Sequence, residues 1–209
     1  MMAPLDARGF AARTGVSRET MDRLEAYAAL LVRWSARLNL IGRNTLGDLW
    51  RRHFLDSAQL LRLMPAGVRS LADIGSGAGF PGLVLAALGV TGVDLIEADG
   101  RKCAFLREAV RVAEIAAAVR HTRVEIMPPH PYEIVTARAC APLDRLLALA
   151  ERFIGPQTRC LFLKGERAEA EVAEARRNWS MTVSCHPSTA DPRGVVLCLE
   201  EVTRARPAG

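Results

Sequence analysis

The residues best placed to do chemistry form a glycine-rich segment and a single acidic residue beyond it. The segment LADIGSGAGFPG carries Gly75, Gly77 and Gly79 shortly after Asp73. Glycines let a backbone turn sharply and approach a ligand where a Cβ atom would collide. Glu97 ends the next apolar segment, DLIE, where a carboxylate can hold both hydroxyls of a ribose. This spacing predicts a nucleotide-cofactor site, with a tight strand-to-helix turn and no ligand as the alternative.

Asp73 discriminates between nucleotide cofactors. The run GAGFPG matches the GxGxxG fingerprint of dinucleotide-binding proteins, which is a weak signal alone. A dinucleotide would place its charged pyrophosphate over this loop, where the carboxylate of Asp73 opposes it. S-adenosylmethionine (SAM) instead carries a sulfonium and an ammonium, and a close pair of opposite charges contributes roughly a few kcal/mol in a partly screened site. We therefore expect SAM rather than NAD.

Cysteine and histidine residues form no recognisable metal site. The five cysteines are dispersed without a CxxC pair, and the four histidines form no HExxH cluster. A scattered, odd number of cysteines in apolar segments is typical of buried, reduced thiols, so we expect no structural metal. The residues concerned are Cys103, Cys140, Cys160, Cys185, Cys198, His53, His121, His130 and His186.

Positive charge is concentrated in the N-terminal third of the chain. Residues 1–70 contain eleven arginines and six acidic residues, whereas residues 71–209 contain seventeen basic and seventeen acidic ones. The whole net charge of +5 therefore lies ahead of the glycine-rich segment. Such a basic region favours an anionic substrate, with nucleic acid as the first candidate. The alternative is an ordinary solvated helical face in an arginine-rich protein.

The N-terminal third has the pattern of packed helices. Ser17 is a candidate N-cap, and apolar residues recur after it at helical spacing as far as Leu38. The segment NLIGRN interrupts this helix, and we expect Thr45 to cap a second one. The run MPAG then ends the helical unit. We therefore expect a basic helical extension at residues 1–67 and a cofactor-binding domain at residues 68–209.

From Ser70 onward, strand and helix patterns alternate, as in a layered α/β fold. The last two strands are joined by a loop too short for a crossover helix, so an antiparallel hairpin should end a mostly parallel sheet. Pro81 suits the first position of the helix after the glycines, whose amide donors would then face the ligand. The expected strands are 70–74, 92–97, 119–124, 133–137, 159–164, 181–185 and 195–202, and the expected helices are 81–88, 100–117, 142–153 and 167–178.

This arrangement of seven strands is similar to the Rossmann-like sheet of class I SAM-dependent methyltransferases, and it differs from the six parallel strands of the dinucleotide fold. Ligands of open α/β sheets bind at the carboxyl ends of the strands. Several polar residues fall at or just after such ends. They are Asp73, Glu97, Glu125, Arg138 and Lys164.

Six segments, in order, closely resemble a known bacterial family. They read NLIGRN, RRHFLDSAQL, DIGSGAGFPGLVLA, LIEADGRKCAFLREA, VTARACAPLDRLL and FLKG, and the resemblance runs from about Ser35 to Val202. The family is the ribosomal RNA small subunit methyltransferase G family, also called glucose-inhibited division protein B. The resemblance implies transfer of a methyl group from SAM to N7 of a guanine in the decoding region of 16S rRNA, forming 7-methylguanosine. It also implies the 30S ribosomal subunit as partner.

The resemblance assigns roles to individual residues. Phe80 would line the cofactor with the glycines, and Val124 and Glu125 would contact the adenine. Arg138 would touch both cofactor and active site, and Lys164 would lie at the mouth of the same cleft, so we expect these two to be catalytic and to orient the guanine or its phosphate. The expected cofactor-binding residues are Asp73, Gly75, Gly77, Gly79, Phe80, Glu97, Val124, Glu125 and Arg138.

The implied chemistry needs no catalytic base. Guanine N7 carries an in-plane lone pair and no proton, so the enzyme has to hold this atom about 3 Å from the methyl carbon, in line with the sulfur. Positioning of this kind lowers a barrier by roughly 7–11 kcal/mol. Because the product purine gains positive charge, surrounding oxygen atoms matter more than a histidine or cysteine nucleophile.

Basic residues near the break between the N-terminal helices are candidate RNA contacts. Contacts from such residues to phosphates position an RNA without reading its sequence. His53 has an equally strong alternative, because with Asp56 it would dock the N-terminal helices onto the sheet. The candidates are Arg43, Arg51, Arg52 and His53.

Three other functions stay open from the residues alone. An NAD-dependent oxidoreductase would use the same glycine loop, although no Tyr-x-x-x-Lys partner is present. A second alternative is a non-catalytic RNA-binding protein, in which Asp73, Glu97 and the glycines would have no role. A third is a methyltransferase that acts on protein or small molecules, which would not explain the concentration of positive charge in the N-terminal third. The longest uncharged stretch, residues 80–93, is too short to span a bilayer, and residues 1–10 show no apolar signal segment. We therefore expect a cytoplasmic monomer without a membrane partner.

Overall fold

One seven-stranded sheet organises the computed structural model, which describes residues 4–138 and 141–205. The strand order is β3-β2-β1-β4-β5-β7-β6. Strands β1 to β5 are parallel to one another, and β7 is antiparallel to both β5 and β6. This confirms a mostly parallel sheet that ends in an antiparallel hairpin. The strands are β1 Leu71–Ile74, β2 Val93–Glu97, β3 Ala117–His121, β4 Ile134–Arg138, β5 Arg159–Lys164, β6 Trp179–Pro187 and β7 Val195–Arg204.

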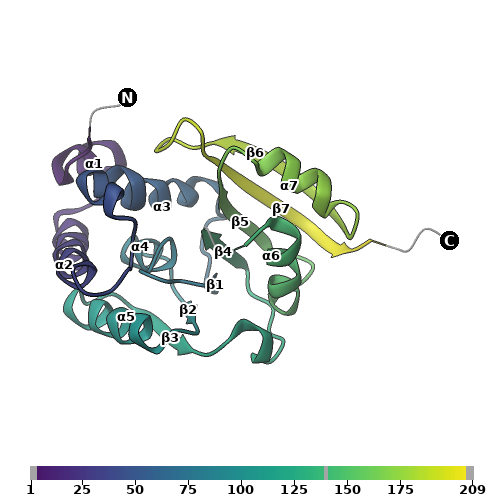
Figure 1. The fold of residues 1–209 in the computed structure, drawn as a ribbon, viewed down its shortest axis with the longest axis horizontal. Coiled ribbons are helices and arrows are strands. Elements are labelled where there is room, and N and C mark those ends of the chain that lie inside the picture. The colour runs from purple at the N-terminus through teal and green to yellow at the C-terminus, as the bar shows by residue number, and fades with distance from the viewer. Residues whose placement is uncertain (1–3, 139–140, 206–209) are drawn as a thin grey trace.

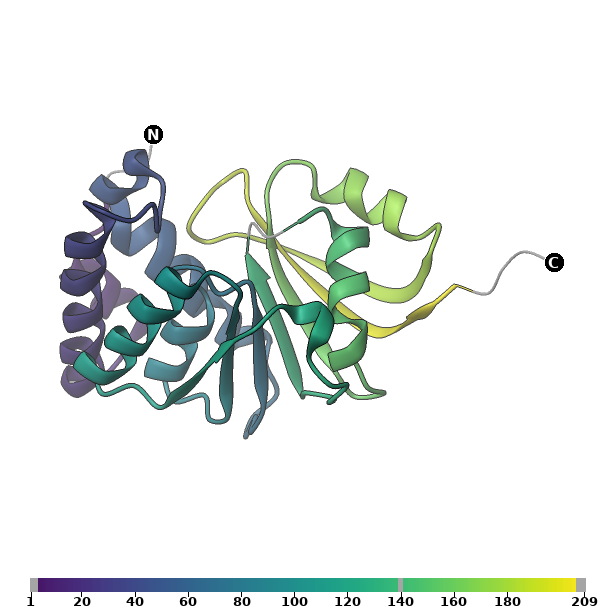
Figure 2. The same cartoon turned by 60° about the horizontal axis from the view of Figure 1, so that its bottom comes forward.

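Helices cover both faces of this sheet (Figures 1 and 2). Side chains alternate between faces along a strand, and in β1 Leu71 packs into one hydrophobic cluster while Ala72 and Ile74 pack into the other. The first cluster lies under α1 Ala7–Thr14, α2 Arg18–Ser35, α3 Asp56–Ala58, α4 Gly82–Ala87 and α5 Gly100–Val112, and the second lies under α6 Leu143–Ala150 and α7 Ala168–Ala175. The sheet is therefore the middle of three layers.

The N-terminal helices are only partly as expected. Ser17 caps α2, because its hydroxyl accepts the amide of Thr20 at 3.2 Å. Thr45 does not cap a second helix; it lies inside a 3-10 helix whose N-cap is Gly42, and its hydroxyl lies against the ring of His53. The expected regular helix is instead a succession of short pieces. They are η1 Arg43–Asp48, the π-helix η2 Trp50–Leu55, α3, and η3 Gln59–Leu63.

The N-terminal helices and the sheet share one hydrophobic cluster. Tyr27 of α2 and Phe54 of η2 pack with their ring centroids 5.3 Å apart. Tyr27 also contacts Phe80 after the glycine loop and Phe105 of α5, at 5.4 and 6.3 Å. The division at residue 67 stays a prediction about the organisation of the chain, and in space the two parts are packed together.

The stretch around β3 differs from the expected pattern. The helix expected to reach residue 117 ends at Val112, and Glu114 has a φ of 50° in the left-handed region, which no helix continues. The strand then pairs early, with Ala117 opposite Val93, and it stops at His121. Val124 consequently belongs to a 3-10 turn, η4 Val124–Ile126, and not to the strand.

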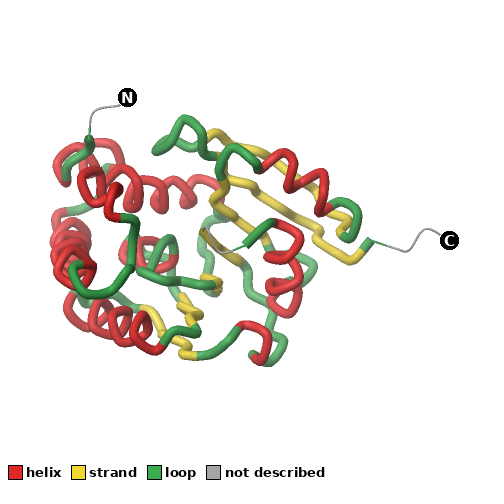
Figure 3. Tube along the Cα trace, in the orientation of Figure 1, coloured by secondary structure: helices red, strands yellow, loops and turns green. Residues whose placement is uncertain are grey.

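The loop between β6 and β7 reaches back to the N-terminal helices. Both strands are longer than expected, and the loop at their tip lies beside the η2–α3 stretch in Figure 3. Ser188 and Asp191 in this loop bond to Asp56 and Arg52, which are more than 130 residues earlier in the chain. Across residues 4–138 and 141–205, no helix has the length and apolar composition to cross a membrane.

Candidate functional site

The glycine loop follows β1, one of the two strands between which the order of the sheet reverses. Gly77 and Gly79 have φ values of 56° and 94°, in the region that residues with a Cβ atom rarely adopt. A Cβ atom on Gly79 would lie 2.9 Å from the hydroxyl of Tyr27, whereas one on Gly77 would meet only the Gly75 carbonyl, at 3.7 Å. The loop is therefore packed against α2 on one side and open above Gly77.

Asp73 lies beneath this loop with no exposed surface. Its Oδ1 accepts the hydroxyl of Thr136 on β4 at 2.9 Å, and its Oδ2 accepts the amide of Gly82 at 3.2 Å. Burial raises the pKa of Asp73 to about 6, against the opposing effect of these hydrogen bonds and of Arg138. Asp73 therefore joins the two strands at the reversal point to the start of α4.

Pro81 is not the first residue of α4; it is the N-cap, and the helix has six residues. The amide of Gly82 is used by Asp73, and the amide of Leu83 donates to the carbonyl of Gly79 at 2.8 Å. The expectation that these helical amides face a ligand is therefore wrong for the first two, because the loop itself takes them.

Glu97, at the end of β2, bridges two loops. Its Oε2 accepts the amide of Gly77 at 2.9 Å, and its Oε1 accepts the amide of Asp99 at 2.8 Å. The side chain is 9% exposed, and each oxygen retains a lone pair. The next loop contains the buried Val124 and the exposed Glu125, whose carboxylate lies 3.9 Å from Arg123. The amide of Thr122 donates to the carbonyl of Glu97 at 3.1 Å, so this loop continues the same edge of the sheet.

Arg138 ends β4 and connects the glycine loop to the N-terminal helices. Its guanidinium lies 4.7 Å from the centroid of the Phe80 ring, and its Nη1 donates to the carbonyl of Arg52 at 3.2 Å. The same nitrogen is 3.9 Å from Oδ2 of Asp56. Burial lowers the pKa of Arg138, but a guanidinium keeps its charge at any physiological pH.

Lys164 ends the neighbouring strand, β5. Its ammonium donates to the carbonyl of Ala141 at 2.6 Å and to Glu171 of α7 at 2.8 Å. A cavity of about 490 Å³ is lined by Lys164 and Arg138 together with Asp56, Ser188 and Asp191. The structure thus brings the two expected catalytic residues to one cavity, and it adds residues from the β6–β7 loop that had no recognisable signal in the sequence.

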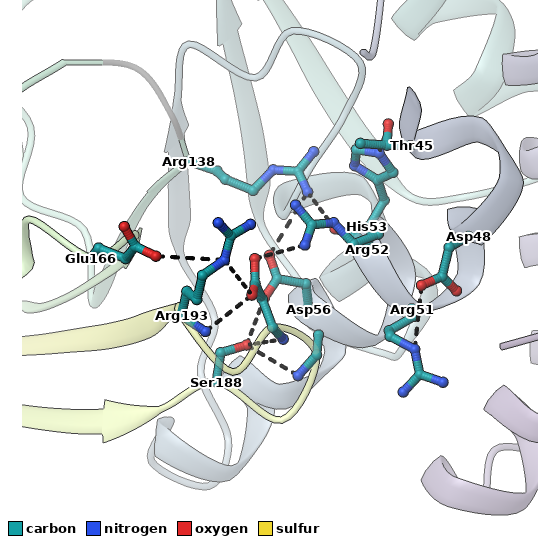
Figure 4. A network of polar contacts seen from close by, with 12 residues as sticks. Thr45, Asp48, Arg51, Arg52, His53, Asp56, Arg138, Glu166, Ser188 and Arg193 are labelled. Carbon is teal, nitrogen blue, oxygen red and sulfur yellow. Dashed lines mark hydrogen bonds and ion pairs between the residues drawn. The ribbon is translucent and has the colours of Figure 1, made fainter. Parts of the chain in front are cut away.

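The four candidate RNA contacts are placed very differently (Figure 4). Arg51 is 4% exposed and lies 3.3 Å from Asp48, so we withdraw it as an RNA contact. Arg52 is partly exposed, with its Nη1 2.6 Å from Oδ2 of Asp191. Arg43 begins η1, and its side chain lies outside the described part of the structure.

His53 occupies a position suited to docking. It is 7% exposed, its Nε2 lies 2.8 Å from the hydroxyl of Thr45, and its ring lies 5.0 Å from that of Phe80. Burial, assisted by the charges of Arg138 and Arg52, lowers the pKa of His53 to about 3, so the ring is neutral. A buried, neutral ring has no surface to offer a phosphate.

The cysteines are mostly buried. Burial raises the pKa of Cys160 and Cys198, which keeps both thiols protonated. Cys185 is exposed and Cys140 lies outside the described residues. Within residues 4–138 and 141–205, no group of three or more histidine, cysteine or acidic side chains is placed to hold a metal ion.

Known proteins resemble this chain over nearly its whole length. A family model described as rRNA small subunit methyltransferase G matches residues 20–192. The ribosomal RNA small subunit methyltransferase G of Paramagnetospirillum magneticum is 54% identical over 194 residues, which cover 93% of this chain and 95% of that protein. The protein of the same name from Rhodospirillum rubrum is 53% identical over 196 residues, which cover 94% and 98%.

A solved structure shows the same fold. The O-methyltransferase from Bacillus cereus in complex with SAH matches 84% of this chain and 90% of that chain, with a TM-score of 0.55 and 13% identity. The sheet order, the glycine loop between β1 and α4, and the sequence identity over nearly full length agree with one another. The chain belongs to the rRNA small subunit methyltransferase G family.

Proposed function

We propose that this protein acts as a monomer on the 30S subunit and methylates N7 of a guanine in the decoding region of 16S rRNA. It is a SAM-dependent RNA methyltransferase with a Rossmann-like fold. One observation supports the more specific proposal: the cavity lined by Arg138 and Lys164 lies at the carboxyl ends of β4 and β5, and β4 pairs with β1, the strand that leads into the glycine loop. Cofactor and target base can therefore meet at one edge of the sheet.

The residues around the glycine loop fit the cofactor. The open space above Gly77 would receive it, and Glu97 would accept hydrogen bonds from the ribose hydroxyls through its remaining lone pairs. Val124 would contact the adenine through its main chain, beside Glu125. Bound SAM supplies an electrophilic methyl group on a positively charged sulfur, and Asp73 would favour that charge from beneath the loop.

Arg138 and Lys164 would align the guanine and need not accept a proton. The lone pair of N7 forms the new bond to carbon as the carbon–sulfur bond breaks, and its electron pair goes to sulfur. Positive charge passes to the purine and no proton leaves it, so the step requires no group that accepts a proton. Holding the reacting atoms in line supplies most of the rate enhancement that such a site can offer.

RNA binding is proposed to involve Arg52 together with Arg43. The partly exposed guanidinium of Arg52 lies against Asp191, which lines the cavity, and a phosphate could replace part of this contact. In an Arg52→Gln variant, the slope of log affinity against log salt should fall by about 0.7–0.9. Arg145→Gln, an exposed arginine of α6 on the opposite face, is the matched control and should leave the slope unchanged.

The test is transfer of labelled methyl from SAM to small subunits from cells that lack the endogenous activity. The RNA is then digested and the labelled nucleoside is identified by mass. Label in 7-methylguanosine from 16S rRNA supports the proposal. Label in another nucleoside, in protein, or in a small molecule refutes it, and an NAD response without SAM binding would indicate an oxidoreductase.

A further inference from the structure

The cavity lined by Arg138 and Lys164 has the size of a ligand site. The residue that distinguishes the target base from other bases is still to be identified. Its volume of about 490 Å³ lies within the range of roughly 300–1,000 Å³ found for small-ligand pockets. An enzyme that modifies a base inside structured RNA takes that base out of its stack and reads its Watson–Crick edge in a pocket. The side chains that face this cavity should therefore include groups that match the target base.

Asp56 is held with one oxygen bonded and the other open. Gln59 and Ser188 donate to its Oδ1 at 2.8 and 3.1 Å. Its Oδ2 lies 3.9 Å from Nη1 of Arg138, which is beyond hydrogen-bond distance, and among the described residues no donor reaches it. The side chain is 16% exposed and lines the cavity (Figure 4). The carboxylate is thus fixed in orientation by protein donors and still has an acceptor oxygen to offer.

The other two carboxylates at the cavity each form a close ion pair. Glu171 lies 2.8 Å from the ammonium of Lys164, and Asp191 lies 2.6 Å from the guanidinium of Arg52. Burial raises the pKa of Asp56, because the ionised carboxylate has lost water and has gained few donors in exchange. A ligand that brings N–H donors would supply what this carboxylate lacks.

The charges of the lining favour a base over a phosphate. The three carboxylates of the lining, Asp56, Glu171 and Asp191, are matched by three cations, Arg138, Lys164 and Arg52. A phosphate in this space would therefore meet no net positive charge. A guanine would present N1–H and the N2 amino group as two adjacent donors, and its ring becomes positively charged when N7 is methylated. An acceptor at N1–H also stabilises that charge, so the lining favours the product of the reaction as well as the base.

We infer that Asp56 determines specificity for guanine in this cavity, with its carboxylate accepting hydrogen bonds from N1–H and the N2 amino group of the target base. This inference rests on the proposed function and identifies the residue that recognises the target base. Arg138 and Lys164 then remain to align the base and its O6. The proton on N1 stays on the base throughout, since Asp56 only accepts a hydrogen bond.

Inosine tests this inference, because it lacks the N2 amino group and keeps N1–H, O6 and N7. Small subunits would be reconstituted with 16S rRNA carrying either guanosine or inosine at the target position, and kcat/KM for methyl transfer measured for each. For the wild-type protein we expect inosine to lower kcat/KM by roughly 10- to 100-fold, the range for loss of one hydrogen bond to a charged group. For Asp56→Asn we expect a lower kcat/KM on guanosine, and a guanosine-to-inosine ratio within about threefold of unity.

Comparing the two ratios removes the intrinsic difference in N7 reactivity between the bases. Asp22→Asn, an exposed aspartate on α2, is the matched control and should keep the wild-type ratio. SAM affinity and the melting temperature of Asp56→Asn should stay near the wild-type values, which shows that the variant is folded. If the variant fails to fold, the wild-type ratio is compared with the guanosine-to-inosine ratio for N7 methylation of the free nucleosides by a small methylating agent in solution. An enzymatic ratio no larger than the solution ratio overturns the inference, and one at least tenfold larger supports it.

The outcomes also separate this inference from the proposed function. No 7-methylguanosine from the wild-type protein on guanosine subunits would refute the proposed function, and the inference with it. Transfer by the wild-type protein with the same guanosine-to-inosine ratio in Asp56→Asn would leave the function intact and overturn the inference. In that case Asp56 serves only to tie the β6–β7 loop to α3.

Discussion

Replacing the buried Asp73 with asparagine should make the protein more stable at neutral pH and a poorer binder of SAM. The carboxylate is fully buried, and burial raises its pKa from 3.8 to about 6. An asparagine keeps an oxygen for the amide of Gly82. Its own amide can donate to the hydroxyl oxygen of Thr136, whose O–H in the wild type donates to Oδ1 of Asp73 at 2.9 Å. The substitution therefore removes a buried charge and can leave the geometry intact.

The magnitude follows from the two pKa values. Because the folded pKa lies above the unfolded one, the unfolded wild-type chain releases its proton first as pH rises, and the wild type loses stability between the two values. One pKa unit corresponds to about 1.4 kcal/mol, so the wild type loses about 3 kcal/mol across the full interval and about 2 kcal/mol between about pH 4.5 and pH 7.5. Below the interval the carboxyl is neutral in both states, and above it the loss is complete.

The assay is urea denaturation of the wild type and Asp73→Asn over that pH range. We expect the difference in free energy of unfolding, variant minus wild type, to rise by about 2 kcal/mol from about pH 4.5 to pH 7.5. Other groups with shifted pKa values, including His53 and Asp56, occur in both proteins, and their contributions cancel to first order. Asp22→Asn, exposed on α2, should give a flat difference.

A flat or falling difference for Asp73→Asn would refute the reasoning. It would mean that Thr136, Gly82 and Arg138 stabilise the ionised carboxylate more than burial destabilises it. The functional counterpart is SAM affinity, which should be at least about tenfold weaker in the variant, because tenfold corresponds to only about 1.4 kcal/mol of lost charge interaction. Unchanged SAM affinity would show that Asp73 only supports the loop.

Three further substitutions test how the site is held, each by urea denaturation beside the wild type. Gly82→Ala should cost about 1–3 kcal/mol, because its Cβ atom would lie 2.7 Å from that of Asp73; a neutral result would mean that the strand and helix separate freely. Leu147→Ala, fully buried under the second face of the sheet, should cost about 2–5 kcal/mol without changing SAM affinity, and a smaller loss would show that the cavity collapses. Tyr27→Phe should lower the free energy of unfolding by about 1–2 kcal/mol and weaken SAM binding, because the Tyr27 hydroxyl donates to the carbonyl of Ala78 in the glycine loop. Unchanged SAM binding would mean that α2 does not help to hold this loop in position.

The secondary-structure features that depend on nearby residues in the sequence agree with the structure. The alternation of strands and helices, the antiparallel end of the sheet and the capping role of Ser17 follow from short-range periodicity and capping chemistry. The errors arose where local signals compete. Thr45 has the residue type of an N-cap, but its hydroxyl lies against His53. The helix that begins at Gly100 ends at Val112, five residues earlier than expected, and the positive φ of Glu114 just beyond it could not be predicted from the residue type.

The sequence by itself determined which residues have the chemistry for a cofactor site, since an acid, three glycines and a second acid at strand ends can be recognised from spacing alone. Only the tertiary structure decided what those residues touch. Asp73 is covered by the loop it precedes, Arg51 and His53 are buried instead of facing RNA, and Asp56 meets Arg138 in a shared cavity. The physical reason is distance along the chain: burial and ion pairing depend on residues that lie tens to more than a hundred positions apart, and local periodicity carries no information about such contacts.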